Sequence, residues 1–287
     1  MTWTLVLTLL LSVLIGLALG LLGGGGSILT VPILTYVAGM DPQEAITSSL
    51  VVVGVTSAVS VLAHARQGRV QWRTGLVFGS AGVVGAFGGG LLGQYIPGTV
   101  LMIAFAVMML ATSFAMIRGR KDGNTPSSER ALPIAMMLLV GVLVGLVTGL
   151  VGAGGGFLIV PALALLGGLS MPAAVGTSLV VITVNSAAGF TGHLFAVSVD
   201  WALVGAVTLA AVVGSVAGAW LAGRIPEAAL RKGFGVFVLV MGVFVLVQEL
   251  PGAAGVAVGF TAAAVGVAAA VCWLLVPKCP LRRWSAS

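Results

Sequence analysis

Two glycine clusters in this chain have the residue types and spacing to bind an anion. The first is Gly23-Gly24-Gly25-Gly26-Ser27, and the second is Gly152-Ala153-Gly154-Gly155-Gly156. Adjacent glycines should break an apolar helix, since each costs about 1 kcal/mol relative to alanine in a helix interior. A helix that restarts after the break presents free N–H groups and the positive end of its dipole, and glycine permits close approach. We predict substrate-binding positions at Gly23, Gly24, Gly25, Gly26, Ser27, Gly152, Gly154, Gly155 and Gly156.

Close packing of helices is the alternative use of glycine in a membrane. Small residues at four-residue spacing, such as Gly85/Gly89 and Gly214/Gly218, let two helices approach each other. We assign the spaced glycines to packing and the two contiguous clusters to helix breaks. Neither cluster is a phosphate-binding P-loop, because no Lys-Ser or Lys-Thr pair follows it.

Hydroxyl and amide side chains lie in the helix predicted after each cluster. We predict that Ser48, Ser49, Thr177, Ser178 and Asn185 contribute to the same substrate site. Ser178 and Asn185 are seven residues apart, which is two helical turns, so both can face one lumen. The alternative is that the hydroxyls bond to carbonyls of their own helix, as they often do in membrane helices.

The only two histidines, His64 and His193, each come at the end of a predicted helix. A histidine pair can relay protons or hold an anion, because imidazole titrates near physiological pH. Interface anchoring and capping of a helix end are the alternative roles. Trp72 and Trp201 are expected to anchor the chain at the membrane interface.

Acidic residues occur only at predicted segment ends or in loops. Cation sites and proton relays usually place a carboxylate within the membrane, so this pattern favours an anion held by amides and hydroxyls. The few His, Cys, Asp and Glu residues predict no metal site, and we find no H-E-x-x-H or G-x-S-x-G motif. We therefore expect no cofactor and no enzyme activity. The seven acidic residues are Asp41, Glu44, Asp122, Glu129, Asp200, Glu227 and Glu249.

The two clusters belong to an internal duplication. Residues 20–32 read GLLGGGGSILTVP and residues 149–161 read GLVGAGGGFLIVP, with 8 of 13 positions identical at an offset of 149 − 20 = 129. The same offset relates His64 to His193. Broken helices at corresponding positions of two repeats indicate a transporter whose binding site lies between the repeats.

Composition indicates that the chain is an integral membrane protein. Hydrophobic residues make up 59% of it, charged residues 7%, and the mean hydropathy is +1.21, whereas soluble domains carry about 25% charged residues. Apolar stretches long enough to cross a bilayer recur along the chain, and we read 3–22 as a retained helix rather than a signal peptide. The predicted segments are 3–22, 27–38, 43–63, 74–94, 99–118, 132–150, 154–168, 172–193, 201–223, 229–249 and 252–276.

The basic residues predict the orientation of the chain in the membrane. They gather in the loop 64–73, the linker 118–130, the loop 224–232 and the tail 278–283, while intervening loops such as 194–200 have none. Cytoplasmic loops attract Lys and Arg, so we expect the N-terminus outside and the C-terminus in the cytoplasm of a multi-pass plasma (inner) membrane protein. Equivalent loops of the two repeats differ in charge, which predicts inverted repeats. Parallel repeats with accidental charge placement are the alternative.

We therefore expect an all-α polytopic membrane protein with two inverted-topology repeats, glycine-broken helices and about 8–10 membrane-spanning helices. Its net charge of +6 is a topology signal, and nothing indicates nucleic-acid binding. The expected divisions are a first transmembrane repeat at 1–118, a cytoplasmic linker at 119–131, a second, inverted transmembrane repeat at 132–250, and an extra helix with a basic cytoplasmic tail at 251–287.

The paired clusters, each followed by a proline, together with the helix starts Thr47–Leu50 and Gly176–Leu179, resemble the sulfite exporter TauE/SafE family, also called the toluene-sulfonate uptake permeases. The resemblance covers about residues 10–250. It implies a plasma-membrane carrier for a small sulfur-containing anion: sulfite, thiosulfate, sulfoacetate or another organosulfonate. It fixes neither the anion nor the direction of transport, and the first cluster differs from the second.

The resulting hypothesis is a secondary transporter that works by alternating access, with coupling to protons or to the gradient of the substrate itself. An anion-selective channel is the alternative, because channels also use amides and helix ends for selectivity. The sequence leaves the oligomeric state open.

Overall fold

The chain is all-α. The computed structural model describes residues 2–118, 134–151, 155–193, 199–222, 224–250, 252 and 261, and every regular element within them is helical. The first repeat contains α1 (Thr2–Leu22), η1 (Gly23–Gly25), α2 (Ser27–Pro32), η2 (Ile33–Val37), α3 (Pro42–Arg66), α4 (Trp72–Gly93) and α5 (Gly98–Arg118). The second contains α6 (Ile134–Val151), α7 (Gly156–Pro161), η3 (Ala162–Leu166), α8 (Met171–His193), α9 (Trp201–Leu221) and α10 (Glu227–Glu249).

The expected segments are confirmed where the structure describes them. Within that part of the chain, five helices are long and apolar enough to cross a membrane: α1, α3, α4, α8 and α9. Asp41 and Asp200 start α3 and α9, because each carboxylate accepts a hydrogen bond from a backbone N–H of the first turn. The linker 119–131, and the extra helix and tail at 251–287 apart from residues 252 and 261, lie outside the described residues.

Two helices of the first repeat pack closely on helices of the second: α1 pairs with α9, and α4 pairs with α6. A Cβ on Gly16 would overlap the Ala211 carbonyl oxygen, and a Cβ on Gly145 would overlap the Gly82 carbonyl oxygen. These two contacts are one contact repeated at the offset of 129, because 16 + 129 = 145 and 82 + 129 = 211. The backbones touch because no side chain separates them, as expected for small residues in membrane helix pairs.

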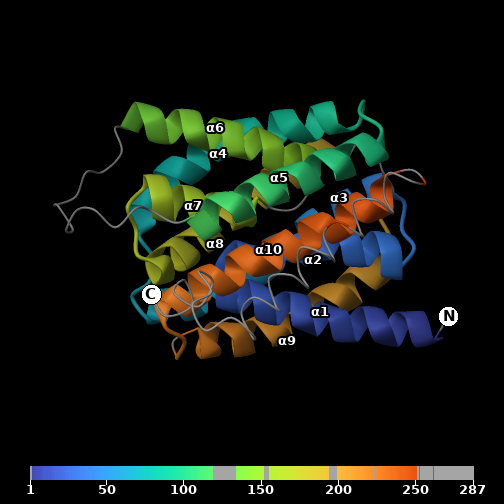
Figure 1. Cartoon of the computed structure of the whole chain (residues 1–287), viewed down its shortest axis with the longest axis horizontal. Coiled ribbons are helices and arrows are strands. Elements are labelled where there is room, and N and C mark those ends of the chain that lie inside the picture. Colours follow the sequence, from blue (N-terminus) through green and yellow to red (C-terminus); the bar gives the residue numbers. More distant parts are fainter. Residues whose placement is uncertain are drawn as a thin grey trace.

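Each pair is joined by a third helix. Ala45 and Val52 of α3 cluster with Val204 and Val207 of α9, so α1, α3 and α9 form what we call the first bundle. By the same pattern α4 packs on α8, where Gly75 contacts Thr177, and α4, α6 and α8 form the second bundle. Figure 1 shows α6 along one edge of the molecule and α1 with α9 along the opposite edge.

The two bundles meet where equivalent helices cross. Gly54 of α3 lies against Ser186 of α8, and Gly189 of α8 lies against Leu50 of α3, so α3 and α8 run antiparallel. Helices α5 and α10, the last of each repeat, also run antiparallel: the Ser113 hydroxyl of α5 donates a 2.7 Å hydrogen bond to the Gly235 carbonyl of α10, and Gly242 of α10 lies against Met109 of α5.

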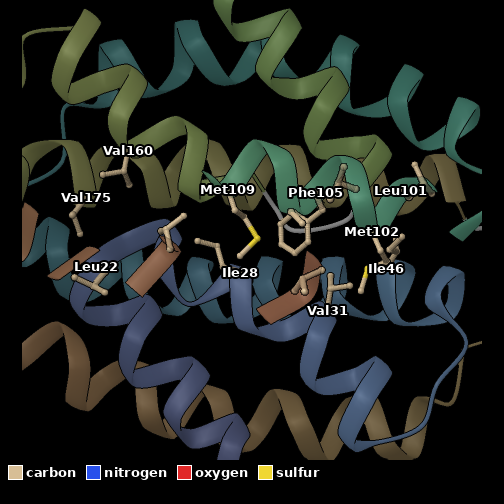
Figure 2. Packing of buried hydrophobic residues seen from close by; sticks show 14 of the residues in the cluster. Leu22, Ile28, Val31, Ile46, Leu101, Met102, Phe105, Met109, Val160 and Val175 are labelled. Carbon is tan, nitrogen blue, oxygen red and sulfur yellow. The ribbon is translucent and has the colours of Figure 1, made fainter. Parts of the chain in front are cut away.

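Helix α5 closes the core over the broken helices. In Figure 2, Met102, Phe105 and Met109 of α5 lie over Ile28 and Val31 of α2, and all five side chains are buried. The same cluster takes in Val160 of α7 and Val175 of α8. Burial of large apolar side chains at this junction holds α2 and α7 against the bundles.

The helix directions place basic loops at one end of the molecule and the described acidic side chains at the other. Arg69 meets Gly176 at the start of α8, so the loop 67–71, the end of α5 and the turn between α9 and α10 share one end of the molecule. The Gln43 side chain donates to the Ile96 carbonyl at the other end, where Asp41, Asp200 and Glu249 also lie. The described basic loops and the described loops without basic residues thus lie at opposite ends. Which end faces the cytoplasm stays a prediction.

Candidate functional site

The first glycine cluster breaks its helix at Gly23. This residue has a φ of +67°, in the left-handed region that side chains other than glycine rarely adopt, and one short 3-10 turn follows. In the second cluster Gly155 has a φ of +66° and directly precedes α7. The predicted breaks are therefore present at both places. Gly152 and Gly154 lie outside the described residues.

The two breaks meet backbone to backbone. A Cβ on Gly24 would overlap Gly156, and a Cβ on Gly156 would overlap Gly24 and lie 2.6 Å from Ile182 Cδ1. Gly24 and Gly156 are 132 positions apart in the chain (156 − 24 = 132), so the contact joins the two repeats. We call this contact the elbow crossing. Its closeness requires that both positions lack a side chain.

The short helices after the breaks end in a wider turn. Within α2 and α7, Pro32 and Pro161 have no N–H to donate, and a π-helical turn follows each of them. The Ala38 N–H accordingly bonds to the Ile33 carbonyl, five residues back. From Ser27 to Val37 the helix has 11 residues, about 17 Å at 1.5 Å per residue, which is too short to cross the hydrocarbon core.

Hydroxyls of the predicted site lie at the elbows but donate to their own chain segments. Ser178 Oγ lies 3.0 Å from the place a Cβ on Gly23 would take, and its hydroxyl donates to the Val175 carbonyl. Ser49 donates to Ile46 in the equivalent way, and Ser27 donates to Gly24. All three serines are fully buried. Each hydroxyl must rotate away from its carbonyl before it can donate to an anion.

Other buried polar side chains lack such a partner. Ser48, Ser57, Asn185 and Ser186 are fully buried, and atoms of each make no hydrogen bond within the described part of the chain. The Asn185 amide lies against Gly82 of α4, which has space for it only because glycine has no side chain. A buried amide without a partner costs free energy, so Asn185 is a candidate to meet a ligand or an ordered water.

The predicted site residues therefore divide into two groups. Ser178 faces the elbow, whereas Asn185, seven residues further along, faces α4. Thr177 also faces α4, and its hydroxyl accepts a 3.0 Å hydrogen bond from the Gln71 N–H. Sequence spacing gave no sign that Ser57 and Ser186 lack partners, although both occupy the same repeat position. The missing hydrogen-bond partners of these two serines become visible only in the tertiary structure, where α3 and α8 cross.

The histidines are buried inside the protein. His64 and His193 are 0% and 3% exposed, and their Nε2 atoms lie 3.0 Å and 2.8 Å from the carbonyl oxygens of Gly20 and Gly149. Of the two predicted alternatives, this geometry is that of a cap on a helix end. Trp72 and Trp201 are 51% and 60% exposed, as side chains that face lipid at the interface would be.

The acidic side chains that the structure describes lie away from the elbow crossing. Asp41, Glu44, Asp200 and Glu249 lie at helix ends, and Glu249 accepts a 2.6 Å hydrogen bond from the Tyr36 hydroxyl. Within the described residues, no three His, Cys, Asp or Glu side chains come together as a metal site requires. Asp122 and Glu129 lie outside those residues.

A cavity of about 370 Å³ opens between the first residues of α1 and α9, lined by Thr4, Thr8, Ala38, Asp200 and Leu203 among others. None of the predicted site residues lines it. We therefore place the candidate site at the elbow crossing, where Gly23, Gly24, Gly156 and Ser178 come together.

An all-α chain with several membrane-crossing helices and two broken helices at its centre is a polytopic membrane protein of the transporter class. The model of the family described as "Sulfite exporter TauE/SafE" matches residues 8–245. The chain belongs to this family, which confirms the resemblance seen in the sequence.

Relatives carry names of the same class. The chain is 35% identical over 240 residues to a "Probable membrane transporter protein" of Xylella fastidiosa strain 9a5c, covering 81% of this chain and 91% of the relative. It is 28% identical to "Probable membrane transporter protein MJ0441" of Methanocaldococcus jannaschii (84% and 96% covered) and 26% identical to "Probable membrane transporter protein YdhB" of Bacillus subtilis (79% and 94% covered). No solved structure matches the chain. The family and these names indicate a membrane transporter rather than an enzyme.

Proposed function

We propose that this protein is a secondary transporter for a small sulfur-containing anion, such as sulfite, thiosulfate, sulfoacetate or another organosulfonate, and that it works by alternating access. The observation that carries this proposal is the elbow crossing of Gly24 and Gly156, which brings two broken helices together between two bundles. Membership of the TauE/SafE family supports both the transport class and the choice of anion to test.

The substrate would bind where the helices restart. Unwound backbone at membrane depth is tolerated where protein buries it, and N–H groups freed by the break attract an anion. Rotation of the Ser49 and Ser178 hydroxyls away from their own helices would add two donors. Binding would then replace hydrogen bonds to carbonyls with stronger ones to a charged group.

Inverted repeats give the transport cycle its two states. The antiparallel crossings of α3 with α8 and of α5 with α10 (Ser113 at Gly235, Met109 at Gly242) support inversion, because equivalent helices of inverted repeats must run in opposite directions. Backbone contacts at glycines hold α1 against α9 in the first bundle and α4 against α6 in the second. The boundary between the two bundles is formed by α3, α8 and the elbows. Rocking at this boundary would open the buried site first to one side of the membrane and then to the other.

The test is anion binding followed by flux. Purified protein is titrated with sulfite, thiosulfate, sulfate, sulfoacetate and acetate while its thermal unfolding is measured, and each anion that binds is followed into proteoliposomes. We expect saturable stabilisation and saturable flux for a sulfur-containing anion, both lost in Gly24→Ala. Gly88→Ala is the matched control, because a Cβ at Gly88 meets nothing within 4 Å. No response to any of the five anions would refute the proposal. Flux that does not saturate with anion concentration, together with single-channel currents, would show that the protein is an anion-selective channel instead.

A further inference from the structure

Both histidines contact the helix end that precedes an elbow. His64 of α3 reaches Gly20, three residues before the break at Gly23, and His193 of α8 reaches Gly149 near the end of α6. These two contacts coincide under the offset of 129, since 64 + 129 = 193 and 20 + 129 = 149. Each joins two helices of the same bundle, α3 to α1 in the first and α8 to α6 in the second.

The contact of His64 supplies a donor to one of the last carbonyls of α1, just before the first elbow. The last carbonyls of a helix have no N–H four residues on, and here the break at Gly23 ends α1 inside the protein. A buried carbonyl without a donor is costly, and no bulk water is available at membrane depth. Since a carbonyl only accepts, Nε2 of each histidine must carry the hydrogen, which makes the imidazole the donor.

Glycines lie next to both contacts. A Cβ on Gly20 would overlap the Ser215 carbonyl oxygen of α9, so α1 cannot move toward α9 to find another partner. A Cβ on Gly93 of α4 would lie 2.9 Å from His193 Cε1, so glycine at this position provides the room for the ring. The helix end is therefore held from one side by a backbone and from the other by the histidine.

The candidate site lies immediately beyond this helix end in the chain. Directly after α1, Gly23 leaves the first bundle and lies against Val175 and Ser178 of the second bundle. The position of the helix end thus determines where the elbow crosses from one bundle to the other.

We propose that His64 and His193 are positioning residues of the transport site: each donates a hydrogen bond that fixes the helix end before an elbow and so sets the elbow crossing. Neither acts as a proton or anion relay in this assignment. The role in transport rests on the proposed function, whereas the effect on the elbow does not, and the experiment separates the two.

The elbow is observed directly by cysteine labelling. In full-length protein with Cys272 and Cys279 replaced by serine, Ser27→Cys places a thiol just after the first elbow at a position that is fully buried. N-ethylmaleimide labelling is then measured with His64, His64→Leu and His64→Gln. Gln offers an amide N–H at about the reach of Nε2, and Leu offers none. Ser113→Cys on α5 is the control, because it is equally buried but belongs to neither bundle.

We expect labelling of Ser27→Cys to be about tenfold faster with His64→Leu, as loss of one buried hydrogen bond implies, and close to the original rate with His64→Gln. Labelling of Ser113→Cys should stay unchanged. Equal rates for His64 and His64→Leu, or equal acceleration by Leu and Gln, would overturn the assignment. If His64→Leu fails to insert, the comparison of His64 with His64→Gln decides, because an accelerated Gln variant contradicts a donor role.

Sulfite flux gives the second readout. His64→Leu and His193→Leu should each raise the KM for sulfite, and the Gln variants should restore it. If labelling responds as expected while no anion is bound or carried by the unaltered protein, the proposed function fails and the positioning of the elbow stands. If flux is normal in both Leu variants, the histidines do not set the site.

Discussion

The two repeats share their packing but differ in their polar groups. The glycine contacts between α1 and α9 recur between α4 and α6, and the bond from His64 to Gly20 recurs from His193 to Gly149. Where the first repeat has Thr56, whose hydroxyl bonds to Val52, the second has Asn185, whose amide has no hydrogen-bond partner among the described residues. Contacts that hold the framework obey the duplication, and so do the serine pairs Ser49/Ser178 and Ser57/Ser186, whereas the pair Thr56/Asn185 does not. The site is therefore expected to be asymmetric even though its scaffold is not.

A second difference lies at the ends of the short helices. Tyr36 of η2 bonds to Glu249 of α10 and packs edge-on against Phe244 at 5.8 Å between ring centres. Position 165 of η3, the equivalent of Tyr36, is a leucine, which has no hydroxyl. The leucine cannot form the equivalent link from η3 to the end of α5, so the two ends of the molecule need not open with equal ease.

The largest expected effect comes from the contact that both repeats share. Gly24→Val should abolish transport and lower the stability by several kcal/mol, because its side chain would have to occupy the backbone of Gly156. Thermal unfolding and anion flux measure the two effects. Gly205→Val is the control, since a Cβ at Gly205 meets nothing within 4 Å. Wild-type flux in Gly24→Val would show that the elbow crossing is not needed.

The elbow hydroxyls test whether the two halves contribute equally. Ser178→Ala should weaken anion binding about tenfold, the effect of losing one hydrogen bond to a charged group. Ser49→Ala changes the equivalent position, and a smaller loss there would confirm an asymmetric site. Calorimetric titration with sulfite measures both. Equal binding by all three proteins would remove these hydroxyls from the site.

Replacing Asn185 by the residue of the other repeat should separate stability from function. Asn185→Thr removes a buried amide that has no partner in the described part of the chain, and the new hydroxyl can bond to the Val181 carbonyl, as Thr56 bonds to Val52. We expect a gain of about 1 kcal/mol in stability together with slower flux. Loss of stability would mean that the amide has a structural role. Faster flux would exclude it from the site.

The smallest effect is expected at Tyr36. Tyr36→Phe keeps the ring against Phe244 but removes the bond to Glu249, which should cost about 1 kcal/mol because Glu249 is only partly buried. Glu249→Gln removes the charge and keeps an acceptor, so it should lose less. Thermal unfolding of both variants measures this. An unchanged unfolding temperature in Tyr36→Phe would show that the link contributes nothing.

Much of the fold follows from the chain itself, and less of the site does. Hydropathy predicts the long helices because the membrane requires runs of apolar residues with internally satisfied backbones. The breaks at Gly23 and Gly155 follow from local backbone preference. The direction in which Asn185 and Ser178 face does not, because residues two turns apart can meet different neighbours when a helix packs against several others.

Sequence alone determined that this protein lies in a membrane, that it is duplicated, and where its helices break, since these depend on composition, repetition and local conformation. Tertiary structure decided which backbones touch. Gly24 meets Gly156, and α1 and α6 each pack on a helix of the other repeat. Each histidine donates to a carbonyl 44 positions away. Such contacts join segments that are distant in the chain, and their existence depends on the space between whole helices rather than on any local pattern.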